Sequence, residues 1–220
     1  MSTLILPICG ESTRYPNQPP KWSIVHRGKT MLEHSVAGIP LDFFDDVVVI
    51  ILEKHLDLYT KLNVPYKIIA LPKQTANQAE TVYQGITKNR IKGHIVIKDC
   101  DNYFKVQPIR DNFVAYFPLS GDVHNAENKS YIEINVYGLI TNIIEKITIS
   151  NTFCCGMYGF ANSDFFCKTY EQNPKYVKFI SDIILYQLLN NQIFIPVKVK
   201  DYVDWGTLKD WQCYIERSEE

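Results

Sequence analysis

Three groups of charged and polar residues follow predicted strands, and together their side chains could bind a metal ion and phosphate. The first is a polar loop, residues 10–21, which begins at a glycine and carries Arg14 and Lys21. The second is Asp-Cys-Asp-Asn at 99–102, and the third is Asp-Tyr-Val-Asp-Trp-Gly-Thr at 201–207. Arginine and lysine bind phosphate oxygens, whereas Mg²⁺ takes one or two carboxylates and shares its remaining positions with water and phosphate. One cationic and two acidic loops on one rim would suit a magnesium–phosphate site.

These groups can act together only if one sheet edge positions them, because ligands of an open parallel sheet bind at the carboxyl ends of its strands. The first half of the chain predicts such a sheet, since short apolar runs alternate with helical patterns. The run at 47–52 is mostly β-branched and uninterrupted, which is typical of a strand buried on both faces. Predicted strands span 3–8, 47–52, 66–70 and 95–98, and predicted helices span 31–38, 54–62 and 76–88.

The second half of the chain contains more strand-like runs than helices. Gly138 lies between two such runs, which indicates a hairpin. Predicted strands span 113–118, 131–136, 139–144, 154–160 and 193–199, and predicted helices span 163–170 and 181–190. The sequence therefore predicts an α/β fold, with a doubly wound, mixed but mostly parallel sheet and a small β-rich lobe. We expect a single domain over 1–220, with halves at 1–110 and 111–220.

The composition argues against several other classes of protein. The 220 residues carry a formal net charge of −1, and this near-neutral balance gives no sign of a nucleic-acid partner. The apolar runs are far shorter than a membrane span, and the first residues lack the features of a signal peptide, so we expect a cytoplasmic protein with no membrane partner. The 6 cysteines include no Cys-x-x-Cys pair, and the sequence shows no zinc-ligand spacing. The oligomeric state cannot be read from the sequence.

Five motifs follow one another along the chain. The first combines Gly-Glu-Ser-Thr-Arg at 10–14 with Pro-Lys at 20–21 and Gly-Lys-Thr-Met-Leu-Glu-His at 28–34. The others are Gln-Thr-Ala-Asn-Gln-Ala-Glu-Thr at 74–81, Asp-Cys-Asp-Asn at 99–102, Gly-Leu-Ile-Thr-Asn-Ile-Ile-Glu-Lys at 138–146 and Val-Asp-Trp-Gly-Thr at 203–207. In this order they resemble the motifs of the sugar-phosphate nucleotidyltransferases, and most closely those that act on capsule or surface-polysaccharide precursors. The resemblance extends over nearly the whole chain.

The resemblance implies the Rossmann-like nucleotidyltransferase fold and the reaction of that family. Such an enzyme transfers a nucleotidyl group from an NTP to a sugar phosphate or another phosphorylated small molecule, uses Mg²⁺ and releases pyrophosphate. The sequence does not fix the base: the short chain and the loop at 74–81 favour CTP or UTP, and dTTP and GTP stay open as alternatives. A phosphate monoester is already nucleophilic at neutral pH, so the reaction needs no Ser/His-type activation, and the sequence shows no such constellation.

The resemblance also assigns roles to residues that would bind the nucleotide. Arg14 and Lys21 are the expected catalytic residues, which stabilise the α-phosphate and the leaving group. The opening loop departs from the family pattern, because Pro-Ile-Cys stands at 7–9 where small residues are usual. The expected nucleotide-binding residues are Pro7, Ile8, Cys9, Gly10, Glu11, Ser12, Lys21, Gln74, Thr75, Glu80, Thr81 and Asp99.

A second set of roles concerns the metal and the acceptor. Asp101 and Asp204 are the expected Mg²⁺ ligands, and Asp99 is a further or alternative ligand. In the family, the glutamate and lysine of the 138–146 motif meet the sugar and its phosphate. The expected acceptor-binding residues are Glu145, Lys146 and Asn102.

Three alternative interpretations depend on parts of the same sequence. Residues 23–30 are one glycine short of a P-loop, which would indicate a kinase or nucleotidase, but 22–26 reads as a strand rather than a flexible loop. The Asp-x-Asp at 99–101 could hold a nucleotide-sugar through a metal in a GT-A glycosyltransferase, although the early arginine and lysine suit a triphosphate better. A non-catalytic sugar-nucleotide-binding protein of the same fold is the third alternative.

Overall fold

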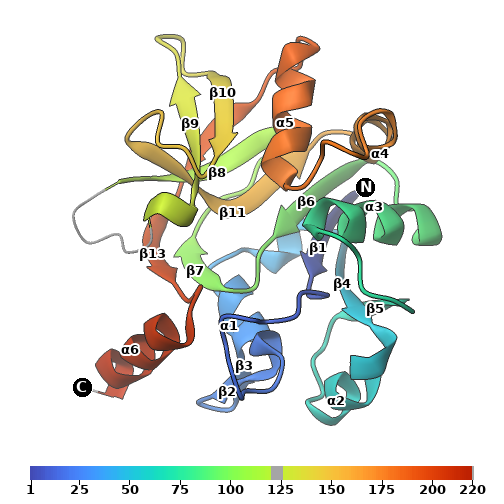
Figure 1. Ribbon diagram of the computed structural model, residues 1–220, viewed down its shortest axis with the longest axis vertical. Coiled ribbons are helices and arrows are strands. Elements are labelled where there is room, and N and C mark those ends of the chain that lie inside the picture. Colours follow the sequence, from blue (N-terminus) through green and yellow to red (C-terminus); the bar gives the residue numbers. More distant parts are fainter. Residues whose placement is uncertain (120–125, 220) are drawn as a thin grey trace.

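The computed structural model describes residues 1–119 and 126–219. Its centre is a nine-stranded sheet with the main strand order β10-β9-β11-β6-β1-β4-β5 (Figure 1). The last five residues of β4 are buried, as expected for β-branched side chains that fill both faces of a sheet. Four neighbouring strands run parallel and end at one edge: β1 (Ser2–Pro7), β4 (Asp46–Leu52), β5 (Lys67–Leu71) and β6 (His94–Lys98).

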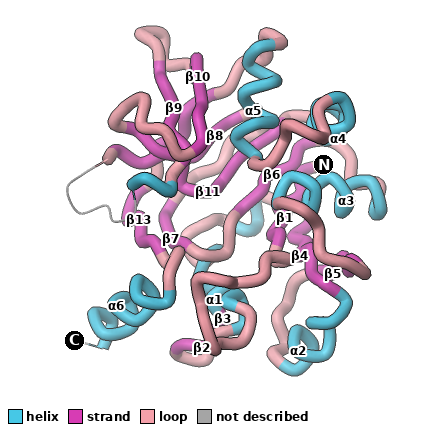
Figure 2. The backbone as a smooth tube through the Cα atoms, in the orientation of Figure 1, coloured by secondary structure: helices cyan, strands magenta, loops and turns pink. Residues whose placement is uncertain are grey.

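Helices cover both faces of this sheet, which confirms the predicted doubly wound α/β architecture (Figure 1 and Figure 2). Along β1, Ile5 packs into the core on one face, whereas Leu4 and Leu6 pack into the core on the other. The first core is closed by α3 (Gln78–Asn89), α4 (Ser163–Gln172) and α5 (Ile180–Leu189). The second core is closed by α1 (Met31–Val36), α2 (Leu56–Lys61) and the 3₁₀ helix η1 (Lys21–Ser23).

The starts of the helices follow from their capping residues. Thr30 and Glu33 form a capping box at α1, and the side chain of Asn77 accepts the hydrogen bond of the Glu80 N–H at the start of α3. The cap at Asn77 fixes the point where the loop after β5 turns into α3. Shorter 3₁₀ turns are η2 (Leu41–Phe43), η3 (Glu53–His55) and η4 (Ala126–Asn128).

The second half of the chain extends the same sheet and forms the predicted β-rich lobe. β11 runs antiparallel to β6 and also pairs with β8 and β9, so it joins the two halves. β9 and β10 form the predicted hairpin, with Gly138 at a φ of 76° that favours glycine. The strands of this half are β8 (Phe113–Pro118), β9 (Ser130–Ile134), β10 (Ile140–Glu145), β11 (Thr152–Phe160) and β12 (Ile195–Lys198).

The acidic run after the last predicted strand is arranged differently from the prediction. β12 ends at Lys198, and the run continues as a further strand, β13 (Lys200–Asp204), instead of a loop. β13 pairs antiparallel with β7 (Asn102–Lys105), which the sequence did not predict, and Asp204 lies opposite Asn102. The two strands are distant in the sequence, so the local pattern of neither shows the pairing. The pairing brings the two acidic groups together.

Two further elements differ from the prediction. The predicted strand over 22–26 is η1 followed by the short β2 (Val25–His26), which pairs with β3 (Lys29–Thr30). The P-loop-like run 23–30 is therefore a hairpin, with Gly28 at its turn, rather than a loop around phosphate.

The chain ends in a helix, α6 (Leu208–Glu219), that the sequence did not predict. Trp211 of this helix and Trp205 just before it are buried in a small core with Tyr15 and Met31. Among the described residues, no helix is long and apolar enough to cross a membrane.

Candidate active site

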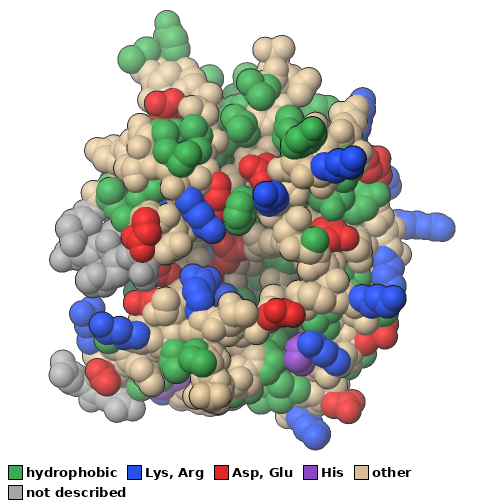
Figure 3. Space-filling view, in the orientation of Figure 1, with side chains coloured by type: hydrophobic (Ala, Val, Ile, Leu, Met, Phe, Trp, Pro, Cys, Tyr) green, Lys and Arg blue, Asp and Glu red, His purple; other side chains and the backbone are tan. Residues whose placement is uncertain are grey.

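Two cavities open at the carboxyl edge of the parallel strands and share a wall. The larger cavity has a volume of about 620 Å³ and the smaller cavity about 200 Å³. Figure 3 shows acidic and basic side chains gathered around a hollow near the middle of this face. The residues that line both cavities are Arg14, Gln78, Asp99 and Asp101.

The larger cavity gathers all but two of the predicted nucleotide-binding residues. Those on its wall are Pro7, Ile8, Gly10, Glu11, Ser12, Lys21, Gln74, Thr75, Thr81 and Asp99. The two exceptions lie behind the wall. Cys9 is buried, with its Sγ 3.4 Å from the Ile50 carbonyl oxygen, and the Glu80 carboxylate accepts a 2.6 Å hydrogen bond from the Ala76 N–H. Glu80 therefore braces the loop after β5 instead of facing the cavity.

The loop after β1 folds back on itself at the entrance to the larger cavity. The Lys21 N–H donates a 3.0 Å hydrogen bond to the Ser12 Oγ, and Ser12 has a φ of 54°. A Cβ added to Gly10 would meet no atom within 4 Å, so the backbone here faces open space. Successive backbone N–H groups in such a turn can form a concave site for an anion.

Asp101 lies at the wall between the cavities, among positive charges. Its Oδ2 is 2.6 Å from the Lys21 Nζ and 3.4 Å from an Arg14 guanidinium nitrogen. Burial alone would raise the pKa of Asp101, but Lys21, Arg14 and Lys129 together outweigh burial and hold the pKa well below its usual range. Burial alone would lower the pKa of Lys21, and Asp101 raises it above the ordinary value. The pair is therefore ionised at neutral pH.

Asp99, only two positions away, has the opposite electrostatic environment. Its Oδ1 accepts a hydrogen bond from the Gln78 amide, and a Cβ added to Gly156 would lie 2.3 Å from its Oδ2. Burial, followed by the negative charge of Asp101, raises the pKa of Asp99 to about 6. The two carboxylates of the Asp-x-Asp run thus differ in charge state in weakly acidic solution.

Lys98, which is fully buried, stabilises the loop that carries both aspartates. The Lys98 Nζ donates to the backbone oxygens of Asp99 and Asn102, at 2.7 and 3.2 Å, and to the Asn102 Oδ1 at 2.6 Å. Burial lowers the pKa of Lys98 to about 8. These three hydrogen bonds fix the tight turn between β6 and β7, so that its two carboxylates point into the cavities.

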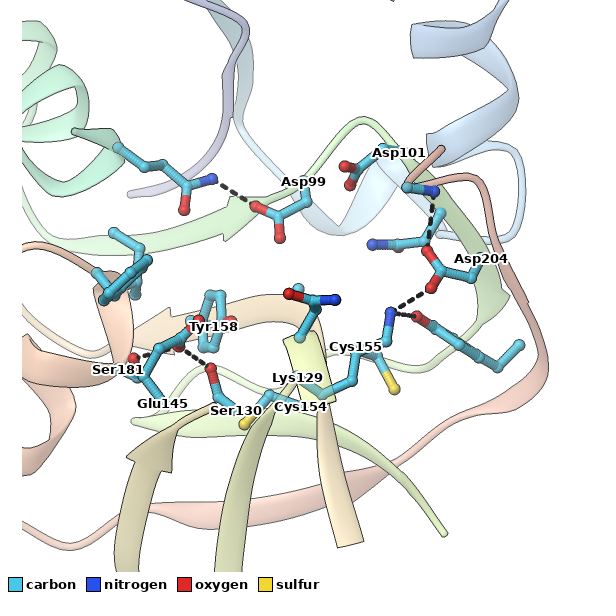
Figure 4. Close-up of a pocket in the computed structure, with 18 of the residues that line it drawn as sticks. Asp99, Asp101, Lys129, Ser130, Glu145, Cys154, Cys155, Tyr158, Ser181 and Asp204 are labelled. Carbon is cyan, nitrogen blue, oxygen red and sulfur yellow. Dashed lines mark hydrogen bonds and ion pairs between the residues drawn. The ribbon is translucent and has the colours of Figure 1, made fainter. Parts of the chain in front are cut away.

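Asp204 completes the acidic side of the smaller cavity (Figure 4). Its position follows from the β7–β13 pairing, and its Oδ1 accepts a 3.0 Å hydrogen bond from the Gly206 N–H. Its Oδ2 forms an ion pair with the Lys129 Nζ, which also donates a 2.9 Å hydrogen bond to the Tyr202 hydroxyl.

The predicted magnesium ligands can be compared with the donors that the ion prefers. The described residues hold no group of three or more His, Cys, Asp or Glu side chains arranged for a metal ion. Asp101 and Asp204 nevertheless line the same cavity, and each is already paired with a cation. Mg²⁺ takes one or two protein carboxylates and otherwise water and phosphate oxygens. The donor set therefore fits an ion that arrives with a phosphate ligand.

Two of the three predicted acceptor-binding residues line the smaller cavity. Glu145 and Asn102 line the smaller cavity, and the Glu145 Oε2 accepts hydrogen bonds from the hydroxyls of Ser130 and Ser181. Lys146 has a φ of 58°, and its Nζ lies 5.0 Å from the centre of the Phe179 ring. Lys146 is not among the residues that line the smaller cavity.

Several residues of the site were given no role from the sequence. Ser130 begins β9 and Lys129 directly precedes it, and the hairpin register that sets Ser130 opposite Glu145 was the signal that could have assigned them. Ser181 and Tyr158 give no comparable local signal, because the packing of α5 and β11 brings them to the cavity. Figure 4 shows these side chains facing Asp99 and Asp101 across the cavity.

No protein-family model and no curated protein sequence matches the chain. Solved structures do match over almost its full length. A nucleoside-diphosphate-sugar pyrophosphorylase from Vibrio cholerae RC9 has 19% identity and a TM-score of 0.81, over 97% of this chain and 99% of that one. The inositol-1-phosphate CTP transferase from T. maritima has 13% identity and a TM-score of 0.77, over 99% and 96%. A UDP-glucose pyrophosphorylase has 13% identity and a TM-score of 0.76, over 100% and 98%. The chain therefore has the α/β fold of these nucleotidyltransferases.

Proposed function

We propose that the protein transfers a nucleotidyl group from an NTP to a phosphorylated small molecule and releases pyrophosphate. The observation that carries the proposal is the meeting of the two cavities at Arg14 and Asp101. A nucleoside triphosphate in the larger cavity and an acceptor in the smaller cavity would approach each other there. The order of the five sequence motifs and the shared fold support the same reaction.

The reaction follows from the placement of charge. An oxygen of the acceptor's phosphate attacks the α-phosphorus and forms a new P–O bond, while the bond between the α-phosphorus and the bridging oxygen to the β-phosphate breaks. The electron pair leaves with pyrophosphate. Arg14 and Lys21 line the larger cavity and would stabilise this negative charge. No general base is needed, so catalysis consists of positioning and charge neutralisation.

Asp101 and Asp204 would hold Mg²⁺ in this proposal, and the ion would neutralise phosphate charge. Their carboxylates face one cavity, and Asp101 stays ionised because of the cations around it. Asp99 is a weaker candidate ligand, since its raised pKa of about 6 reflects a site that disfavours its charge.

The finer substrate assignments are also proposals. We expect residues 1–110 to bind the nucleotide and 111–220 to supply most of the acceptor site, within a single domain. We favour a pyrimidine nucleotide, CTP or UTP, on the sequence alone. The names of matching structures include a CTP transferase, a thymidylyltransferase and a UDP-glucose pyrophosphorylase, so they do not choose among the pyrimidine nucleotides. The proposal that the acceptor is a sugar phosphate used to make capsule or surface polysaccharide rests on the sequence resemblance.

The test is release of pyrophosphate in the presence of Mg²⁺, with CTP, UTP, ATP and GTP each combined with a panel of sugar and alcohol phosphates. Release that requires one NTP and one acceptor is the expected result. A thermal shift with one NTP but no release across the panel would favour a non-catalytic binding protein. Hydrolysis or transfer from a nucleotide-sugar, without pyrophosphate release from any NTP, would favour a glycosyltransferase.

A further inference from the structure

Lys129 is the charged residue of the site that the proposed reaction leaves without a role. The cations that line the smaller cavity, among the described residues, are Arg14 and Lys129. Arg14 also lines the larger cavity and contacts Asp101, so it belongs with the nucleotide's phosphates. Lys129 lines only the smaller cavity, which would receive the acceptor. The residue expected at the acceptor's phosphate, Lys146, is not on that wall.

The surroundings of Lys129 hold its ammonium group in place. The side chain is 13% exposed, and its Nζ lies 5.5 Å from the centre of the Tyr202 ring and 5.8 Å from that of Phe153. The Tyr202 hydroxyl accepts one of its hydrogen bonds at 2.9 Å. A charge held in such a partly dry site acts more strongly on an incoming anion than a solvated charge does. Tyr202 can keep its hydrogen bond while the ammonium group changes its ionic partner.

That ionic partner is Asp204, one of the two proposed magnesium ligands. The Lys129 Nζ pairs with the same Asp204 carboxylate that would bind the ion, so the lysine and a metal ion compete for it. An acceptor phosphate in the smaller cavity would offer Lys129 a different anion. Moving the lysine onto that phosphate would free an oxygen of Asp204.

We infer that Lys129, rather than Lys146, binds the phosphate of the acceptor, and that its transfer from Asp204 to that phosphate couples acceptor binding to metal binding. The inference rests on the proposed function for the identity of the acceptor. Its two consequences concern binding and need no turnover. Phosphate should bind through Lys129, and a divalent ion should bind more tightly to Asp204 once phosphate has engaged the lysine.

The experiment compares wild type with Lys129→Met, Lys146→Met and Lys168→Met. Lys168 is an exposed residue of α4, so its variant controls for the loss of one positive charge. Binding of inorganic phosphate and of the panel's sugar phosphates is measured by calorimetry without NTP, and binding of Mn²⁺ by EPR with and without phosphate. Lys129→Met should weaken phosphate about 10- to 100-fold, as expected for a charge-assisted hydrogen bond. Without phosphate, this variant should bind Mn²⁺ more tightly than wild type does. Added phosphate should raise the Mn²⁺ affinity of wild type but not that of the variant.

Several outcomes would overturn the inference. If Lys129→Met binds phosphate as tightly as wild type, Lys129 does not bind the acceptor's phosphate. It would then be only a counter-ion of Asp204, even if the variant bound Mn²⁺ more tightly. If only Lys146→Met loses affinity for phosphate, the phosphate binds to Lys146, as the sequence motif predicts. Equal losses of phosphate affinity in all three variants would indicate a non-specific effect of charge. Absence of phosphate binding to wild type would also overturn it.

The two proposals fail in distinguishable ways. If wild type releases pyrophosphate but Lys129→Met keeps its acceptor KM, the inference falls and the proposed function stands. If no NTP and acceptor pair gives turnover while Lys129→Met still loses phosphate, the proposed function falls and Lys129 remains an anion-binding residue.

Discussion

The two cavities of the site are built in different ways. The larger cavity, about 620 Å³, is formed mostly by two continuous loops, after β1 and after β5. The smaller cavity, about 200 Å³, is formed by side chains from β9, β10, β11, β13 and the start of α5. A continuous loop is visible in the sequence as a motif, whereas a wall of separate strands is visible only in the fold. The difference suggests that the larger cavity carries the common chemistry and the smaller cavity carries the choice of acceptor.

The strongest test of this comparison is removal of a cation from the wall of the larger cavity. Lys21→Ala should lower kcat by at least about 10²–10³-fold, because the charge on the leaving pyrophosphate would lose a stabilising cation. The measurement is steady-state release of pyrophosphate, with thermal unfolding as the check on folding. A kcat within a few-fold of wild type would remove Lys21 from the mechanism.

A pair of glycine substitutions should show that the two cavities tolerate added volume differently. Gly156→Ala places a Cβ 2.3 Å from the Asp99 Oδ2 at a backbone φ of 74°, and it should destabilise the fold by about 2 kcal/mol or more. Gly10→Ala is the matched control, since its Cβ would meet no atom within 4 Å, and it should stay within about 0.5 kcal/mol of wild type. Chemical unfolding measures both, and equal losses would contradict the contrast.

A change confined to the smaller cavity should affect the acceptor alone. Glu145→Gln keeps the size of the side chain but removes the charge that accepts hydrogen bonds from Ser130 and Ser181. We expect the acceptor KM to rise about 10-fold, with the KM of the NTP unchanged. Kinetics at saturating levels of the other substrate separate the two values. A rise in the KM of the NTP would show that the cavities do not divide the substrates.

A further expected effect is a pH dependence of stability due to Asp99. Its pKa of about 6 in the folded chain lies above the ordinary value of about 3.9, so the folded state binds the proton more tightly than the unfolded state. The Asp99 contribution to stability should therefore be present below about pH 4 and be lost as the pH rises to about 6. Asp99→Asn should lack this decline. Thermal unfolding of both proteins between pH 4 and 7.5, with a chelator present, measures the difference, and parallel curves would contradict the assignment.

The sequence predicted the parallel strands and the larger cavity because both depend on local patterns. The apolar run of β4 and the Gly10–Arg14 and 74–81 motifs each lie within one short segment. It failed for β7 and β13, in which charged and polar residues break the apolar pattern and which are stabilised by pairing between distant segments. The family motif assigned Lys146 to the acceptor, and this assignment stays a prediction, since the Lys146 Nζ lies 5.0 Å from the centre of the Phe179 ring and Lys146 does not line the smaller cavity.

The β7–β13 pairing makes both cavities depend on one late segment of the sequence. Asp204 reaches the acidic edge only through this pairing, and the turn that follows is fixed by the Tyr15 hydroxyl, which donates to the Trp205 carbonyl, and by the Leu208 N–H, which donates to the Arg14 carbonyl. The first loop is therefore braced by the segment at 205–208. Removal of residues 200–219 would take Asp204 from the smaller cavity and also release the loop on the wall of the larger cavity, so both cavities depend on this one segment.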